Sequence, residues 1–438
     1  MSQNIMVTLI SLALYLSSII GGNSNPIPAY NSPARPSSNI TSSSTGVVTG
    51  NSVAVYQAIG SRQSVGQLQR GDYVDIVNRE GSWYKVRLDN GTTGYIASFT
   101  LMPAAKGIST PSSSHAGKHT VLGYYITDSR TPSMNSLRAH YATLTAISPW
   151  TWEVKANGSL TPTFDTKDTA NALKYAGERN LRTYALIHNL TLDAKGNHNF
   201  NATLAHNLLA NPQARQRLVA NIHRTLTDWR MSGVHIDFEM VLAKDRQNLV
   251  AFMRELYNTL HPAGFEVTMA LPSKTRDSVT NSWSGGYDYA ALARYTDQVM
   301  LMTYDEHWRG GPAGPVASLG WVDSVIRFAL NDGVPASKIV LGIAGYGYDW
   351  PRRGNARALT YDQAMNLASN YKAKVMWDNQ SKVPYFRYGD GRQVWFENRQ
   401  SISHKLALVN KYNLAGISLW RLGQEDDGIW QVISDMLH

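Results

Sequence analysis

Three ionisable side chains alternate along one short segment of the sequence, residues 232–239 (SGVHIDFE). Because successive side chains of a β-strand point to opposite faces, His235, Asp237 and Glu239 share one face if the segment is a strand. Carboxylic acids placed in this way can exchange protons with a bound substrate. Both faces of a parallel barrel strand are normally apolar, so three such groups are costly unless they are hydrogen-bonded or used. The segment predicts a catalytic site, with a buried structural polar cluster as the alternative.

Two other segments end in side chains that could bind a polar substrate. In the apolar run 298–304, Met302 and Tyr304 have the same parity, so Tyr304 would point inward, and Asp305 follows it. Trp420 ends the last apolar run of the chain, where its ring could stack on the apolar face of a sugar. Plain core packing is the alternative for both aromatic residues.

Further aromatic side chains lie near expected strand ends. Trp150, Trp152 and Trp308 follow such ends, and Tyr124 and Tyr125 close the first apolar run. We expect them to line sugar subsites, with loop packing as the alternative.

The elements that must position these residues form a repeating pattern from residue 119 onward. Eight apolar runs alternate with helical stretches: 121–125, 144–148, 182–188, 233–238, 266–271, 298–304, 338–344 and 415–420. Eight strand–helix units predict a (β/α)8 TIM barrel, with a small α+β insertion at about residues 349–400. Glu239 lies at the C-terminal end of the fourth run, which is where barrel enzymes place their chemistry.

The chain before the barrel predicts a different organisation. Residues 5–20 are uncharged and mostly apolar, and residues 22–24 (GNS) follow with the spacing of a signal-peptidase site. This is typical of a secretory signal peptide over residues 1–24, with an uncleaved anchor as the alternative. The stretches 25–45 and 104–118 are rich in Pro, Ser and Thr and predict flexible linkers. Between them, 46–103 holds short apolar runs separated by turns and predicts a small all-β barrel, ahead of the TIM barrel at 119–438.

Residues 46–103 resemble bacterial SH3-like domains. The resemblance rests on the order Gly71-Asp72, then Trp83-Tyr84-Lys85-Val86, then Gly94-Tyr95-Ile96. Modules of this family often hold secreted hydrolases on peptidoglycan. The resemblance therefore implies binding to the bacterial cell wall, with a spacer that binds nothing as the alternative.

Composition excludes several kinds of site. The 438 residues include no cysteine, which excludes disulfides, thiolate metal sites and cysteine nucleophiles. The formal net charge of +9 is spread along the chain without a run of Lys or Arg, which argues against a nucleic-acid-binding arm. A diffuse positive charge suits weak attraction to a polyanionic surface such as a cell wall, or only solubility.

Residues 119–438 resemble glycoside hydrolase family 18, the chitinase family. The family motif D-G-x-D-x-D-x-E on the fourth strand is matched by Gly233, Asp237 and Glu239. Two further motifs of the family are matched by residues already singled out: Met302, Tyr304 and Asp305 on the sixth strand, and Trp420 on the eighth.

Departures from the family pattern indicate a subgroup. Ser232 and His235 replace the first two aspartates of the motif, and the third strand ends in His188-Asn189 instead of Gly-Gly. The segments 302–308 and 416–426 look most like the spore and cell-wall branch, which comprises peptidoglycan N-acetylglucosaminidases.

The resemblance implies a retaining, substrate-assisted mechanism. Glu239 would protonate the glycosidic oxygen, and the 2-acetamido oxygen of the substrate would attack the anomeric carbon. Asp237 would hold the acetamido N–H, and Tyr304 the acetamido oxygen. His235 would donate a hydrogen bond to Asp237 or pair with it as imidazolium, with a satisfied core histidine as the alternative. No cofactor and no metal are expected.

The sequence thus predicts a glycosidase that is secreted, associated with the cell wall and active on β-1,4 bonds at N-acetylglucosamine in peptidoglycan. Two alternatives remain open. One is a chitinase or chitooligosaccharide hydrolase, and the other is a catalytically weak glycan-binding wall protein. Neither nucleic acid nor a stable membrane span after signal removal is expected.

Overall fold

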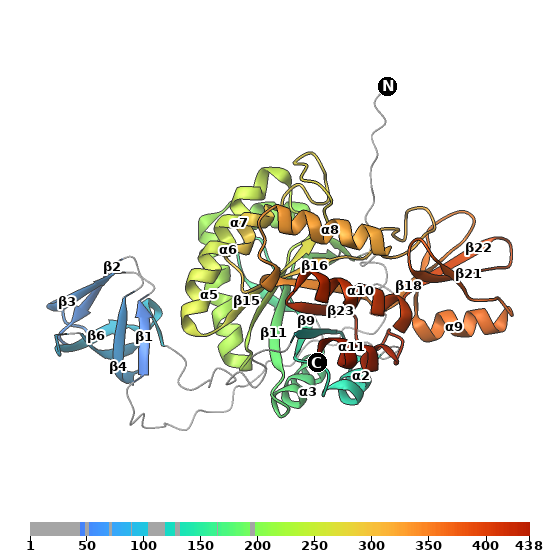
Figure 1. Ribbon diagram of the computed structural model, residues 1–438. Coiled ribbons are helices and arrows are strands. Elements are labelled where there is room, and N and C mark those ends of the chain that lie inside the picture. Colours follow the sequence, from blue (N-terminus) through green and yellow to red (C-terminus); the bar gives the residue numbers. More distant parts are fainter. Residues whose placement is uncertain are drawn as a thin grey trace. The chain divides into compact units, whose positions relative to one another are not determined.

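A computed structural model gives the structure of the protein (Figure 1). The residues that it describes are 44–48, 52–69, 72–88, 90–103, 119–127, 132–163, 165–192 and 198–438. They fall into two compact units, one with the strands between residues 44 and 103 and one with the elements from Thr120 onward. The expected signal peptide, the linker 104–118 and most of the linker 25–45 lie outside the described residues. Within the described ranges, no helix combines the length and apolar character that crossing a membrane requires.

The larger unit is built on a closed barrel of parallel strands, as predicted. In the described chain its strands are β8 (Thr120–Tyr125), β9 (Ala146–Val154), β11 (Arg182–His188), β14 (Gly233–Asp237), β15 (Glu266–Pro272), β16 (Gln298–Met302), β17 (Ile339–Ala344) and β23 (Gly416–Trp420). The ring closes because β8 pairs in parallel with both β9 and β23. A short strand, β10 (Leu160–Pro162), adds antiparallel to β9.

Helices follow the barrel strands in order and surround the sheet (Figure 1). They are α2 (Ser133–His140), α3 (Thr166–Gly177), α5 (Pro212–Trp229), α6 (Arg246–Leu260), α7 (Tyr289–Ala293), α8 (Leu319–Asn331), α10 (Arg399–Tyr412) and α11 (Ile429–Leu437).

Helix α5 shows how the sequence determines the start and the buried face of one of these helices. Asn211 caps its first turn, Pro212 occupies the first helical position, and Leu218, Ile222 and Leu226 recur at intervals of four on its buried face.

Two smaller elements decorate the loop after β11. The hairpin of β12 (Leu190–Leu192) and β13 (His198–Phe200) is followed by α4 (Ala202–Leu209), which precedes α5.

The predicted α+β insertion lies between β17 and α10. Its elements are β18 (Tyr346–Trp350), β19 (Arg357–Thr360), α9 (Tyr361–Asn370), β20 (Met376–Asp378), β21 (Val383–Tyr388) and β22 (Arg392–Phe396). The strands form an antiparallel sheet in the order β19-β18-β22-β21-β20, and Figure 1 shows this lobe at one side of the barrel. Its first strand starts at Tyr346, directly after β17, and therefore slightly before the expected residue 349. We call residues 346–396 the inserted lobe.

The amino-terminal unit is all-β, as predicted. Its described strands are β1 (Ser44–Val48), β2 (Ser52–Tyr56), β3 (Ser64–Gln69), β4 (Tyr73–Glu80), β5 (Trp83–Arg87), β6 (Thr93–Ala97) and β7 (Leu101–Pro103). They form one antiparallel sheet in the order β3-β2-β6-β5-β4-β1-β7 around a core that includes Val55, Val86 and Ile96. The first strand begins at Ser44, inside the segment expected to be a linker.

Candidate active site

Strand β14 and the turn after it carry the predicted acidic residues. His235 and Asp237 lie in the strand, and Glu239 follows its C-terminal end. All three side chains are buried. The alternation expected from the sequence therefore places these groups on one face, at the end of the barrel where parallel strands finish.

A pocket with an empty volume of about 280 Å³ opens over the two carboxyl groups. Seven of its lining residues are candidates from the sequence: Tyr124, Trp150, Asp237, Glu239, Met302, Tyr304 and Trp420. The eighth, Ala270 of β15, is one that the sequence reasoning missed. Ala270 and Thr268 point to the same face because side chains alternate along a strand, and this was the available signal. A small apolar residue in an apolar run has no reactive group, however, so nothing marked Ala270 as a pocket residue.

The pocket environment keeps Glu239 protonated. Burial raises its pKa well above the usual value for a glutamate, and the nearby charges of Asp237 and Asp305 raise it further. Burial also raises the pKa of Asp237. A carboxyl group in this setting can serve as a proton donor near neutral pH.

The phenol of Tyr304 is also held neutral. Burial raises its pKa well above the usual value, and the charges of Asp237 and Glu239 act in the same direction. Tyr304 therefore keeps its proton and can donate a hydrogen bond into the pocket.

The expected hydrogen bond or ion pair between His235 and Asp237 is not formed. The His235 Nδ1 lies 2.9 Å from the Thr268 hydroxyl, which donates its own proton to the Val234 carbonyl at 3.0 Å, so Nδ1 must be the donor. The Nε2 atom then accepts from the Tyr124 hydroxyl at 3.0 Å. Burial lowers the pKa of His235 to about 3, which keeps the ring neutral. His235 thus sits beneath the pocket and orients Tyr124.

Asp305 does not line the pocket either. It has a positive φ of 60° and accepts hydrogen bonds from Tyr346 at 2.5 Å and Tyr348 at 3.0 Å, both on β18 of the inserted lobe. Burial raises the pKa of Asp305 to about 6. Asp305 contacts the lobe because β18 follows β17 directly. The alternation of side chains along β16 could not reveal this contact.

The aromatic candidates separate into two groups. Trp150 and Tyr124 pack against Trp420 with ring centroids 5.2 Å apart, and all three line the pocket. Trp152 is buried against Trp229, outside the pocket. Trp150 and Trp152 lie within β9 because this strand runs on to Val154, whereas the sequence placed both after a strand end.

Trp308 and Tyr125 belong to the second group. Trp308 lies in the loop after β16 and packs over Gly310 and Gly311, where added side chains would collide with its ring. Tyr125 donates to Asp168 at 2.7 Å. Neither residue lines the pocket, so their place at sugar subsites stays a prediction, with loop packing as the alternative.

The described residues contain no cluster of His, Asp or Glu that could hold a metal ion.

Comparisons with known proteins agree with this geometry. The sequence pattern of "Glycosyl hydrolases family 18" matches residues 195–425, and that of "Bacterial SH3 domain" matches 51–101. An uncharacterized glycosylase, YvbX of Bacillus subtilis (strain 168), is 31% identical over 318 residues, which cover 71% of this chain and 90% of the relative. The cortical fragment-lytic enzyme of the same organism is 32% identical over 304 residues, covering 67% and 68%. The crystal structure of a chitinase from Chromobacterium violaceum ATCC 12472 superposes with a TM-score of 0.68 at 32% identity, covering 73% of this chain and 99% of that one.

Proposed function

The chain belongs to family 18 of the glycosyl hydrolases, and we propose that it cleaves β-1,4 bonds at N-acetylglucosamine in peptidoglycan. The observation that carries the proposal is the pair of buried acids, Asp237 and Glu239, which share one pocket with Tyr304 and Trp420. The likeness to a cortical fragment-lytic enzyme favours peptidoglycan as the substrate.

Cleavage begins with Glu239 as the general acid. Its proton passes to the glycosidic oxygen as the bond from that oxygen to the anomeric carbon breaks. The acetamido oxygen of the same sugar attacks the anomeric carbon and forms a cyclic oxazolinium ion. Water then attacks the anomeric carbon, the ring opens, and Glu239 takes back a proton, so configuration is retained.

Asp237 and Tyr304 position the internal nucleophile. Asp237 accepts the acetamido N–H, and its negative charge offsets the charge of the oxazolinium ion. Burial is the cause of its raised pKa, with no hydrogen bond from a described residue opposing it, so the carboxyl group is available to the substrate. Tyr304 donates to the acetamido oxygen. Holding this group near the anomeric carbon turns an intermolecular attack into an intramolecular one.

The amino-terminal unit supports a wall location. Its match to bacterial SH3 domains, together with the diffuse positive charge of the chain, suits attachment to a polyanionic wall. We propose that residues 1–24 direct secretion and that the unit over 46–103 binds the wall and keeps the barrel at its substrate.

Parallel digestion of purified peptidoglycan and colloidal chitin tests the substrate. Release of fragments that carry reducing-end N-acetylglucosamine from peptidoglycan is the expected result. Release from chitin alone would replace the proposal by a chitinase, the alternative favoured by the likeness to the Chromobacterium violaceum structure. Binding to either glycan without any release would contradict both.

A further inference from the structure

The turn that carries Glu239 has no regular backbone pairing. Strand β14 ends at Asp237, and the next element is the short 3-10 helix Ala243–Asp245. Within the turn, Met240 has a positive φ of 58°. Buried backbone N–H and C=O groups must find partners, so side chains from elsewhere have to hold this turn.

Asn189 holds one side of the turn. It comes directly after β11 and is completely buried. Its Oδ1 accepts from the Glu239 backbone N–H at 2.9 Å, and its Nδ2 donates to the Glu239 carbonyl at 2.8 Å. One amide side chain therefore binds both backbone groups of Glu239, which fixes the residue in position and in rotation.

Tyr287 holds the other side of the turn. Its hydroxyl donates to the Phe238 carbonyl at 2.7 Å and accepts from the Val241 N–H at 3.4 Å. The preceding Gly286 packs so closely that an added Cβ would lie 2.2 Å from the Val241 carbonyl oxygen. Burial, and secondarily the charge of Glu239, raise the pKa of Tyr287, so its hydroxyl keeps the proton that it donates.

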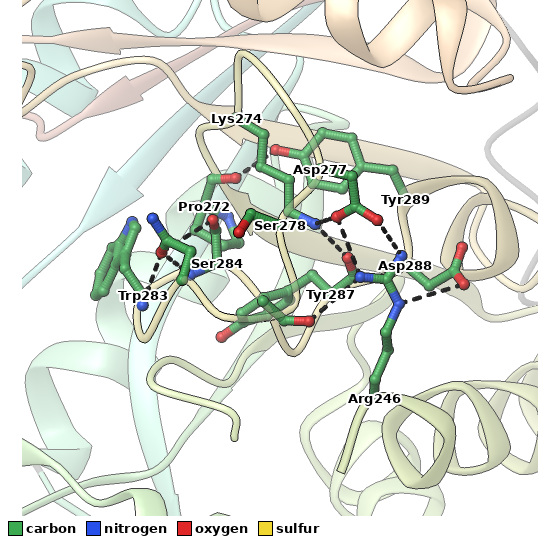
Figure 2. A network of polar contacts seen from close by, with 12 residues as sticks. Arg246, Pro272, Lys274, Asp277, Ser278, Trp283, Ser284, Tyr287, Asp288 and Tyr289 are labelled. Atoms are coloured by element: carbon green, nitrogen blue, oxygen red, sulfur yellow. Dashed lines mark hydrogen bonds and ion pairs between the residues drawn. The ribbon is translucent and has the colours of Figure 1, made fainter. Parts of the chain in front are cut away.

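A network of charged groups fixes the loop that presents Tyr287 (Figure 2). The Lys274 ammonium, only 1% exposed, donates to the Tyr287 carbonyl and to Asp277 at 2.8 Å. Arg246, the first residue of α6, binds the Asp277 carboxylate through two hydrogen bonds of 2.9 and 3.1 Å and donates to the Gly285 carbonyl at 3.2 Å. The loop is thus bound to the helix that comes after the turn of Glu239.

We propose that Asn189 and Tyr287 are positioning residues that aim the Glu239 carboxyl group at the glycosidic oxygen. The inference rests on the proposed role of Glu239 as acid. Neither residue lines the pocket in the described structure, so both act through the backbone of residues 238–241.

The test uses two substrates that differ in their need for an acid. A peptidoglycan tetrasaccharide of alternating N-acetylglucosamine and N-acetylmuramic acid has a sugar leaving group that must be protonated. The 2,4-dinitrophenyl β-glycoside of the disaccharide N-acetylmuramyl-N-acetylglucosamine instead releases a phenolate that leaves without a proton. The quantity kcat/KM reports the steps up to release of the leaving group. A displaced acid should therefore slow the first substrate and spare the second.

Tyr287→Phe removes one hydroxyl and leaves the ring in place. We expect kcat/KM to fall about 10-fold for the tetrasaccharide and less than about 3-fold for the dinitrophenyl glycoside. The larger loss is a part of the rate factor that a general acid usually contributes. Tyr289→Phe is the matched control, because Tyr289 is equally buried and donates to the Pro272 carbonyl, away from the turn. The control should show equal, small changes for both substrates.

Two results would overturn the inference. Equal losses for both substrates in Tyr287→Phe would show that Tyr287 acts on overall structure, while the proposed function would stand. Failure of the unmodified protein to cleave either substrate would remove the proposed function and the inference with it. Asn189→Leu should reproduce the selective loss more strongly, and if that variant does not fold, Tyr287→Phe decides alone.

Discussion

The buried carboxyl groups at the mouth of the barrel differ from those in and beside the inserted lobe. Asp349 of β18 accepts two hydrogen bonds from Arg392, at 2.6 and 3.0 Å, and Glu397 lies 2.7 Å from the buried Lys405 ammonium. Asp237 and Glu239 are also buried, yet among the described residues no cation pairs with them. A cation beside a buried carboxylate compensates its charge, so removing either partner is costly, whereas burial without a cation raises the pKa of Asp237 and Glu239 and leaves both carboxyl groups available to a substrate.

The largest expected effect concerns the unpaired acid. Glu239→Gln keeps the shape of the side chain but removes its proton donor, so kcat on the glycan should fall about 10³-fold. Thermal unfolding of the variant should match that of the unmodified protein, because no ion pair is lost. Retained turnover would assign the acid role to another group.

The paired acid should show the opposite behaviour. Glu397→Gln leaves the Lys405 ammonium buried without a counter-charge, so the free energy of unfolding should fall by about 3–5 kcal/mol. Guanidinium unfolding measures this change. Activity per folded molecule should be unchanged, and its loss would show that the two kinds of buried acid are not separate in function.

The smallest effect is a displacement of the pH profile. Glu239 must be protonated, so kcat/KM falls as the pH rises through its pKa. The charge of Asp305, present above its own pKa of about 6, raises the pKa of Glu239. Asp305→Asn removes this charge and should move the alkaline limb to lower pH. Asp349→Asn, the matched change in the paired group, should leave the alkaline limb of the pH profile in place. Movement of that limb to higher pH in Asp305→Asn would contradict the proposed effect of the Asp305 charge on Glu239.

Features set by local periodicity were predicted well from the sequence. Apolar runs of the right length indicated the barrel strands, and the parity of Asp237 and Glu239 indicated the face that they share. The alternation of side chains along a strand shows which face a residue lies on, but not which residues it contacts across the barrel. It could therefore not show that the two ring nitrogens of His235 form hydrogen bonds with Thr268 and Tyr124.

Contacts made by loops could not be predicted from local sequence patterns either. Asp305 contacts tyrosines about forty residues further along the chain, because the lobe is inserted directly after β17. Asn189 was visible only as a departure from a family motif, and Tyr287 carried no signal, since its role depends on how a long loop folds back onto the turn of Glu239.

The anomeric configuration of the first product tests most directly whether cleavage proceeds with retention, which substrate-assisted attack requires. Proton NMR, recorded during the first minutes of glycan cleavage, distinguishes the α from the β anomer before they interconvert. Because the acetamido group attacks first and water second, we expect the β anomer to appear first. Initial release of the α anomer would mean direct attack by water and would contradict the proposal that the substrate supplies its own nucleophile beside Asp237.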